Sequence, residues 1–290
     1  MMAPGYYVFT GGERVPRHVT HVLIDNALKF VPARSFEYHP NIQEVICHDG
    51  VEKIEEEAFC ECPRLRRVII PGVKVLEEKA FFLCKALANI ECGKMEIIGG
   101  AAFGICESLR NIDLPSIKVV EGYAFNACSN LISVKFGNDL ETIGERTFRA
   151  CGRSLERITI PLKDGMITDD RTFQGCDKLN RIDLVGGVHE TVSALLMEEW
   201  KNDMNEEINS ISQILQNTHG GTYCEAGGKA QAIRAWIRSV HCKYTHYKAE
   251  HQRYLNVTAA TLQPALPNDI VLKSIFPFVE LPSHSFDEED

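Results

Sequence analysis

Residues 102–115 read AFGICESLRNIDLP, and the same pattern recurs along more than half of the chain. Its phenylalanine returns at intervals of 22 to 25 residues. The phenylalanines of the pattern are Phe36, Phe59, Phe81, Phe103, Phe125, Phe148 and Phe173. A fixed period of about 20 to 50 residues is typical of solenoids, in which each repeat forms one coil and buries its apolar side against the next. We therefore expect a stack of coils.

Other residues of the pattern keep a fixed distance from the phenylalanine. From the second copy onward a cysteine follows three residues later, and His39 stands at this position in the first copy. The cysteines are Cys62, Cys84, Cys106, Cys128, Cys151 and Cys176. Free cysteine is among the most buried residue types, so we expect these thiols to point into the stack without forming disulfides. The stretch from phenylalanine to cysteine is expected to form a short helical turn.

The combination of A-F-x-x-C with L-x-x-I-x-L resembles the BspA-like subfamily of leucine-rich repeats over residues 19–185. This resemblance implies a repeat solenoid, a β-rich right-handed coil of about seven to eight repeats of 22–25 residues. It also implies a non-enzymatic interaction scaffold, with a short strand of each coil on a concave face.

The strand of each coil is expected just before a proline or glycine, because proline does not donate to a strand ladder. Alternation along the strand points Val68 and Ile70 inward, and Arg67 and Ile69 outward. The outward positions are the predicted partner-binding residues, with their three arginines as the expected anchors. These residues are Arg67, Ile69, Asn89, Glu91, Asn111, Asp113, Ser133, Lys135, Arg157, Thr159, Arg181 and Asp183. The alternative for each of them is an ordinary solvated sheet surface.

Composition limits the class of partner. The net charge of −9 on 290 residues argues against general nucleic-acid binding, since that affinity comes mainly from neutralising phosphates. No apolar run approaches the ~20 residues that span a bilayer, and residues 1–12 lack the pattern of a signal peptide. These observations favour a cytoplasmic protein that binds neither nucleic acid nor membranes.

The repeat pattern stops at Gly186-Gly187, and the chain is expected to divide there. The predicted parts are an irregular lead-in over 1–18, the solenoid over 19–187, a helical region over 188–279 and an acidic flexible tail over 280–290. Within the helical region, apolar residues at helical spacing predict helices at about 190–217, 229–262 and 268–276.

The two longer predicted helices differ in charge. The first carries six acidic residues and one lysine, whereas the second is mainly basic. We expect them to pair as an antiparallel hairpin that covers the last coil, because terminal repeats of a solenoid need a capped outer face. The alternative is that these helices bind a second partner.

Motifs for catalysis or metal binding are incomplete. His189-Glu190 begins like a zinc-protease helix, but Ser193 stands where the second histidine is needed. Gly228-Lys229 resembles the end of a phosphate-binding loop without its other conserved positions. Cys242 and His246 are four residues apart, without evident further ligands. We therefore predict no catalytic residues, no metal and no cofactor.

A short C-terminal segment suggests a different function. Residues 266–276, which begin with Leu266-Pro267, resemble the opening of an F-box, a motif that docks adaptors of ubiquitin ligases. The main hypothesis is a non-enzymatic protein-interaction scaffold that binds a partner on the concave face. The alternative is a ubiquitin-ligase substrate adaptor. The sequence does not identify the partner.

Overall fold

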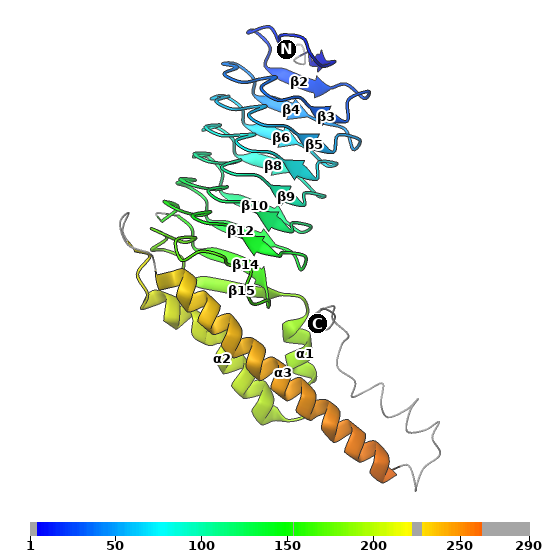
Figure 1. Cartoon of the computed structure of the whole chain (residues 1–290), viewed down its shortest axis with the longest axis vertical. Coiled ribbons are helices and arrows are strands. Elements are labelled where there is room, and N and C mark those ends of the chain that lie inside the picture. The colour runs from blue at the N-terminus through cyan, green and yellow to red at the C-terminus, as the bar shows by residue number, and fades with distance from the viewer. Residues whose placement is uncertain (1–4, 153, 222–227, 263–290) are drawn as a thin grey trace.

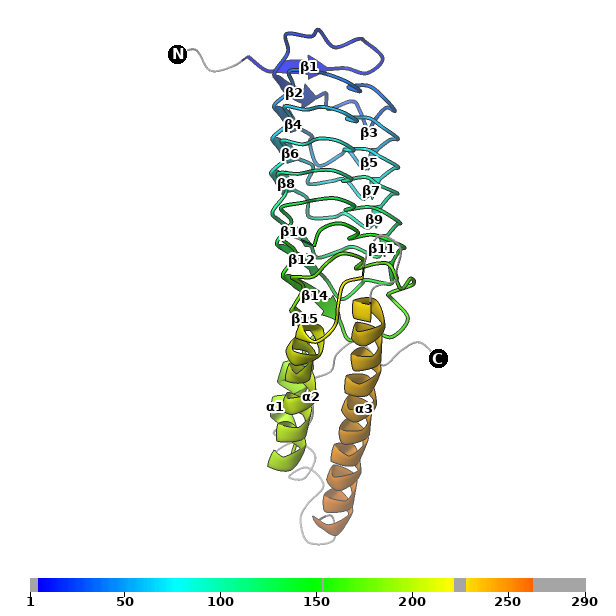
Figure 2. The same ribbon diagram turned by 90° about the vertical axis from the view of Figure 1, so that its left-hand side faces the viewer.

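The computed structural model describes residues 5–152, 154–221 and 228–262. These residues form a column of stacked coils followed by three helices (Figure 1). Each full coil contributes strands to two sides of the column (Figure 2), and neighbouring strands on each side pair in parallel. The solenoid expected from the repeat is therefore confirmed.

The first side of the column carries the longer strands. We call its outward surface the long-strand face. Its strands are β1 (Tyr7–Phe9), β2 (His21–Ile24), β4 (Glu44–Ile46), β6 (Arg67–Ile69), β8 (Asn89–Glu91), β10 (Asn111–Leu114), β12 (Ser133–Phe136), β14 (Arg157–Pro161) and β15 (Arg181–Val185).

The second side carries two-residue strands, and we call its outward surface the short-strand face. Its strands are β3 (Phe30–Val31), β5 (Lys53–Ile54), β7 (Val75–Leu76), β9 (Ile97–Ile98), β11 (Val119–Val120) and β13 (Thr142–Ile143). A single bridge from Ile143 to Ile167 extends this ladder to the next coil.

A stack of phenylalanine rings runs through the interior. The ring centroids of Phe59 and Phe81 lie 5.2 Å apart with an interplanar angle of 4°, and those of Phe148 and Phe173 lie 5.5 Å apart at 2°. This separation is near the strand spacing of about 4.7–4.9 Å and lies within the range of offset-stacked rings. One ring per coil therefore fits the distance that the backbone ladders set.

The repeat cysteines lie beside this stack and are buried, as the sequence predicts. Each thiol donates a hydrogen bond to the carbonyl oxygen of the phenylalanine in the preceding coil, for example Cys128 Sγ to Phe103 O at 3.0 Å. Burial raises the pKa of the Cys151 thiol to about 12, so the neutral donor form persists at physiological pH. His39 replaces cysteine where the preceding coil is atypical, and its Nε2 lies 3.1 Å from Pro16 O.

The phenylalanine–cysteine stretch is not the short helical turn that its spacing suggests. In the first six copies it consists of turns in which the residues two before and two after the phenylalanine are left-handed, as at Tyr123 (φ 60°) and Ala127 (φ 58°). Alternate N–H groups consequently point to the next coil, where Phe125 N donates to Thr147 O at 3.0 Å. Each left-handed residue costs about 1–2 kcal/mol, and this third ladder of hydrogen bonds offsets that cost.

The expected irregular lead-in over 1–18 contains a strand. β1 pairs in parallel with β2, and the Phe9 ring packs against Phe36 with centroids 4.7 Å apart. β1 therefore continues both the ladder and the ring stack at the N-terminal end of the column. Its alternation of β-forming residues is typical of a strand, but it lies outside the repeat pattern.

The ladder of long strands is interrupted once. β8 ends a five-stranded sheet and β10 begins a four-stranded one, whereas β9 and β11 remain paired on the other side. Glu91 and Asp113 occupy equivalent positions across this interruption, and like charges placed opposite each other destabilise strand pairing. Cys92, which is only partly buried, also replaces the larger apolar residue found at this inward position in Ile70 and Leu114.

The C-terminal part contains α1 (Val188–Ala194), α2 (Glu198–Gln216) and α3 (Gly228–Leu262). The single helix expected at 190–217 is thus two helices, because the chain becomes extended at Leu195 (ψ 147°). This break buries the Leu195 side chain and lets Leu196 N donate to His251 Nδ1 at 3.2 Å. The segments predicted as a helix at 268–276 and as a tail at 280–290 lie outside the described residues.

The helices cover the last coil of the solenoid (Figure 1). Gly175 N donates to Gly220 O at 2.9 Å, so the chain after α2 extends the turn ladder. The buried ammonium of Lys229 donates to the carbonyl oxygens of Asp177 (3.0 Å) and Leu179. These contacts satisfy backbone groups that the next coil would otherwise pair.

The expected charge pairing between the helices is only partly correct. Lys243 of α3 contacts Asp203 and Glu207 of α2, each at 2.9 Å. In contrast, Arg234 pairs with Asp170 and Arg238 with Asp164, and both of these acids belong to the last coil. The basic side chains near the start of α3 therefore attach the hairpin to the solenoid, while apolar residues such as Trp236 join the two helices.

Gly93 and Gly137 provide a matched test of the close approach between coils. They occupy the same repeat position, but a Cβ at Gly137 would lie 1.8 Å from Pro115 O, whereas one at Gly93 would meet no heavy atom within 4 Å. We expect Gly137→Ala to lower the free energy of unfolding by about 1–3 kcal/mol through overpacking. Gly93→Ala should change it by less than about 0.5 kcal/mol. Denaturant unfolding checks both; equal effects would contradict the packing.

The buried cation of the cap allows a second test. We expect Lys229→Met to lower the free energy of unfolding by about 1–3 kcal/mol, because it removes the donor from two buried carbonyl oxygens. Lys178→Met replaces an exposed lysine of the same coil and should be nearly neutral. Thermal unfolding followed by circular dichroism compares the two variants; a neutral result for Lys229→Met would show that the ammonium does not stabilise the cap.

Candidate functional site

The predicted binding residues all lie on the long-strand face, and each is exposed or partly buried. Strand register arranges the outward residues of this face in two columns. The first column contains His21, Glu44, Arg67, Asn89, Asn111, Ser133, Arg157 and Arg181. The second contains Val8, Leu23, Ile46, Ile69, Glu91, Asp113, Lys135, Thr159 and Asp183. The interruption between β8 and β10 separates the two columns into an N-terminal and a C-terminal half.

From β1 to β6 the second column is aliphatic. Val8, Leu23, Ile46 and Ile69 follow one another in register from β1 to β6. Val8 is 48% exposed, and the other three are partly buried. We call these four residues the aliphatic ladder. Adjacent coils lie about 4.8 Å apart, so the ladder presents a continuous apolar strip about 14 Å long.

A charged network borders this strip. The Tyr6 hydroxyl donates to Glu44 Oε2 at 2.6 Å, and the Arg67 guanidinium contacts Glu44 at 3.1 Å and Glu91 at 2.7 Å. The hydrogen bond to Glu44 raises the pKa of Tyr6, because the bond is made by the protonated hydroxyl. Arg67, one of the three expected anchors, lies between these two carboxylates.

The C-terminal half of the face is polar and charged. Arg157 and Arg181 both contact the Asp183 carboxylate, each through Nε at 2.9 Å. Lys135 and Asp113 lie 3.6 Å apart. Two guanidiniums therefore share one carboxylate, which leaves one uncompensated positive charge in this cluster.

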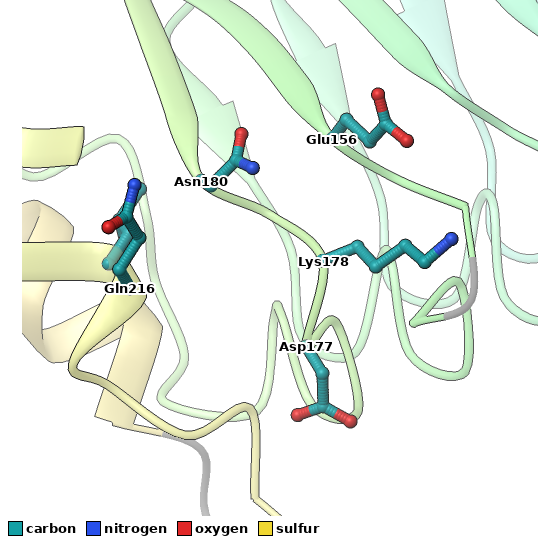
Figure 3. Close-up of a pocket in the computed structure, with 6 residues that line it drawn as sticks. Glu156, Asp177, Lys178, Asn180 and Gln216 are labelled. Carbon is teal, nitrogen blue, oxygen red and sulfur yellow. The ribbon is translucent and has the colours of Figure 1, made fainter. Parts of the chain in front are cut away.

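The polar half ends against α2, where two hollows lie along the junction. One hollow of about 370 Å³ is lined by Arg181, Ile182, Asp183, Leu184, His189, Ile208, Asn209, Ile211 and Ser212. The other, of about 250 Å³, is lined by Glu156, Asp177, Lys178, Asn180, Leu215 and Gln216. In Figure 3 Asp177 and Lys178 point in different directions, and Gln216 at the end of α2 points toward neither of them. These side chains do not converge as a catalytic set would, so the second hollow extends the surface of the face.

Three residues of the aliphatic ladder are absent from the sequence-based site. Leu23 and Ile46 occupy the repeat position of Ile69, so extending the outward register to the first two coils would have identified them. Val8 lies in β1, which precedes the repeat and carries none of its marker residues. Alternation of β-forming residues is its only sequence signal.

The incomplete motifs have structural roles in the fold. Ser193 Oγ donates to Glu190 O at 2.8 Å, Lys229 belongs to the cap, and Cys242 is exposed on α3. Across residues 5–152, 154–221 and 228–262, no group of three or more His, Cys, Asp or Glu side chains has an arrangement suited to a metal ion. Nor does any helix there combine the length and apolar character needed to cross a membrane. The F-box-like segment at 266–276 falls beyond the described part of the chain.

The repeat region matches a known family. The family described as BspA type leucine-rich repeat region matches residues 17–118 and 96–214, with six copies. No curated protein sequence matches the chain significantly.

Solved structures also match this chain. One is a leucine-rich repeat protein from Bacteroides ovatus (20% identity, TM-score 0.48), with 59% of this chain and 47% of that protein covered. Another is the T. pallidum leucine-rich repeat protein (22% identity, TM-score 0.40), with 62% and 69% covered. The chain thus spans about half the length of the Bacteroides ovatus protein.

The hydrogen bond between Tyr6 and Glu44 predicts a pH-dependent signal. In the Glu44→Gln variant the Tyr6 pKa should fall toward its ordinary value of about 10, because the charged acceptor is gone. Absorbance at 295 nm during alkaline titration should show that one of the eight tyrosines ionises at a lower pH in this variant than in the native protein. Glu91→Gln removes a carboxylate that contacts Arg67 but not Tyr6, so it is the control. Identical titrations for Glu44→Gln and the native protein would contradict the contact.

Proposed function

This chain belongs to the BspA-type leucine-rich repeat family, and we propose that it is a non-enzymatic protein-interaction scaffold whose partner docks on the long-strand face. The repeat family supports the scaffold role, since stacked coils build an extended surface that repeat proteins use for binding. The non-enzymatic assignment is part of the same proposal.

The aliphatic ladder is the observation that carries this proposal. Val8, Leu23, Ile46 and Ile69 form an outward-facing apolar strip on an otherwise polar face, with the network of Tyr6, Glu44 and Arg67 beside it. An apolar centre with a polar rim is the usual anatomy of a protein interface. Polar side chains at these outward positions would suit a merely solvated sheet, so the run of four aliphatic residues favours docking of a partner.

The C-terminal half would add charge selectivity to this docking. Arg157 and Arg181 share Asp183, and the remaining positive charge suits an acidic side chain of the partner. Arginine offers a planar fork of donors for a carboxylate. Charge complementarity of this kind mainly affects specificity and the rate of association.

A cytoplasmic location also belongs to the proposal. The six repeat cysteines each donate an Sγ–H hydrogen bond to a phenylalanine carbonyl oxygen. This arrangement requires thiols, which the cytosol keeps reduced. The proposed location is therefore supported by a structural role for reduced cysteine in every central coil.

Affinity capture from lysate, analysed by mass spectrometry, tests the proposed face. The variant Ile46→Thr/Ile69→Thr keeps β-branched residues in the strands while shortening the aliphatic ladder. The amount of specific partner recovered should fall at least about tenfold relative to the native protein, because each anchor contributes ~1 kcal/mol or more to binding. Arg157→Glu/Arg181→Glu should lower recovery of the same partner. Val257→Thr, a change at a 59% exposed residue of α3, is the matched control.

All variants are first compared by thermal unfolding, so that lost capture reflects the surface. If the same proteins are recovered in equal amounts with all variants, the long-strand face is not the docking surface.

A further inference from the structure

The short-strand face carries a second apolar column, on a different side of the solenoid. Strand register aligns Phe30, Lys53, Val75, Ile97, Val119 and Thr142 from β3 to β13. Phe30 is 45% exposed, and Val75, Ile97 and Val119 are partly buried. Three successive coils thus present aliphatic side chains outward. Among the described residues no element covers them (Figure 2).

Carboxylates are in excess beside this column. Five of them share three cations: Arg34 contacts Glu56 and Glu57, Lys53 contacts Glu55 and Glu77, and Lys79 contacts Glu57 and Glu78. Glu121 adds a sixth carboxylate. It accepts a hydrogen bond from Gly100 N at 2.9 Å, and no cation within the described residues pairs with it. The six carboxylates and three cations leave a net charge of −3.

The apolar column and the carboxylates line one hollow of about 390 Å³. Its lining contains Val75, Leu76, Ile97 and Gly99 together with Glu56, Glu77, Glu78 and Glu121. Gly99 stands at the repeat position of Glu77 and Glu121 and adds no carboxylate, and a Cβ there would lie 2.8 Å from Glu78 N. The hollow therefore has an aliphatic floor, and its polar lining side chains are all glutamates.

We propose that the short-strand face is a second docking surface, for a protein segment that carries lysine or arginine together with aliphatic side chains. Long basic side chains lay their aliphatic stems on apolar surface and keep the charged end in a polar environment. Here the stem packs on Val75 and Ile97, and the charged end meets Glu78 or Glu121. Charge complementarity selects this occupant, because an acidic or neutral segment would leave the excess carboxylates without a counterion.

This surface differs in charge from the one proposed for the main partner. The polar half of the long-strand face has two arginines around one aspartate, whereas the short-strand face has an excess of glutamates. The two surfaces therefore suit partners of different charge and lie on different sides of the same column. A scaffold with this arrangement holds two proteins at once.

Fluorescence anisotropy tests the proposal, with the full chain and a labelled dodecapeptide of alternating lysine and valine as probe. The variant Glu78→Gln/Glu121→Gln keeps the acceptor oxygens and removes two charges. We expect it to bind the probe at least fivefold more weakly, and Ile97→Thr to weaken binding as well. Glu198→Gln/Glu199→Gln removes the same charge from α2 and should bind like the native protein. Binding should fall steeply with added salt.

Two control peptides separate specific docking from general attraction. A peptide with glutamate in place of lysine should not bind, and one with serine in place of valine should bind more weakly than the probe. Equal binding by the lysine–serine peptide, or equal weakening by the α2 control variant, would show a diffuse electrostatic effect and overturn the proposal. Unchanged binding by Glu78→Gln/Glu121→Gln would overturn it too. Thermal unfolding confirms that each variant is folded.

Discussion

The distance between neighbouring coils is the constraint on which the rest of the structure depends. Parallel backbone hydrogen bonds on three sides of the column hold successive coils about 4.8 Å apart, and every interior side chain must fit that distance. Aromatic rings in offset stacks meet this requirement, and a thiol can reach the carbonyl oxygen of the coil before it. Glycine at 137 meets the same requirement by leaving out a side chain. The inward residues of each repeat are therefore those that fit the same spacing between neighbouring coils.

The same distance shapes both candidate surfaces. Because each coil places one residue at each outward position, a property repeated at one position becomes a continuous stripe along the column. Aliphatic residues on three or four successive coils produce the two apolar strips. Differences between coils, such as glutamate in one and glycine in the next, produce the changes of charge. Both candidate surfaces therefore combine a repeated outward residue type with charges that vary between coils, whereas the stability of the stack comes from the inward residues of the repeat.

The repeat sequence predicted the solenoid, the inward cysteines and the outward register, because the residues that indicate each of these features recur at equivalent positions in several repeats. Features that occur only once in the chain were harder to predict. β1 carries none of the repeat markers, and the break between α1 and α2 is accompanied by a contact with His251, which is distant in the sequence. The left-handed turns were missed because the residues that adopt them, such as Tyr123 and Ala127, are not glycine. Only the ladder of hydrogen bonds between coils explains why those conformations are accepted.

The pairing of Arg67, Arg157 and Arg181 could not be predicted from the register either, because it depends on which acidic side chain each arginine reaches, in an adjacent coil for Arg67 and Arg157 or in the same strand for Arg181. Sequence spacing showed that these side chains point outward, but not that each is already engaged by a carboxylate. The attachment of α3 to the last coil could not be predicted either, because it depends on which basic side chains of α3 reach Asp164 and Asp170.

The interruption between β8 and β10 has a mechanical consequence. At this level the long-strand side of the column lacks a backbone ladder, while β9 and β11 stay paired on the short-strand side. The short-strand side should therefore resist bending more than the long-strand side. Bending should concentrate at this level. The continuous side, where β9 and β11 are paired, would act as the hinge, and the interrupted side would open. Such a bend would tilt the aliphatic ladder relative to Arg157 and Arg181. It would thereby adjust the proposed long-strand docking surface to partners of different length, while the acidic hollow on the continuous side kept its shape.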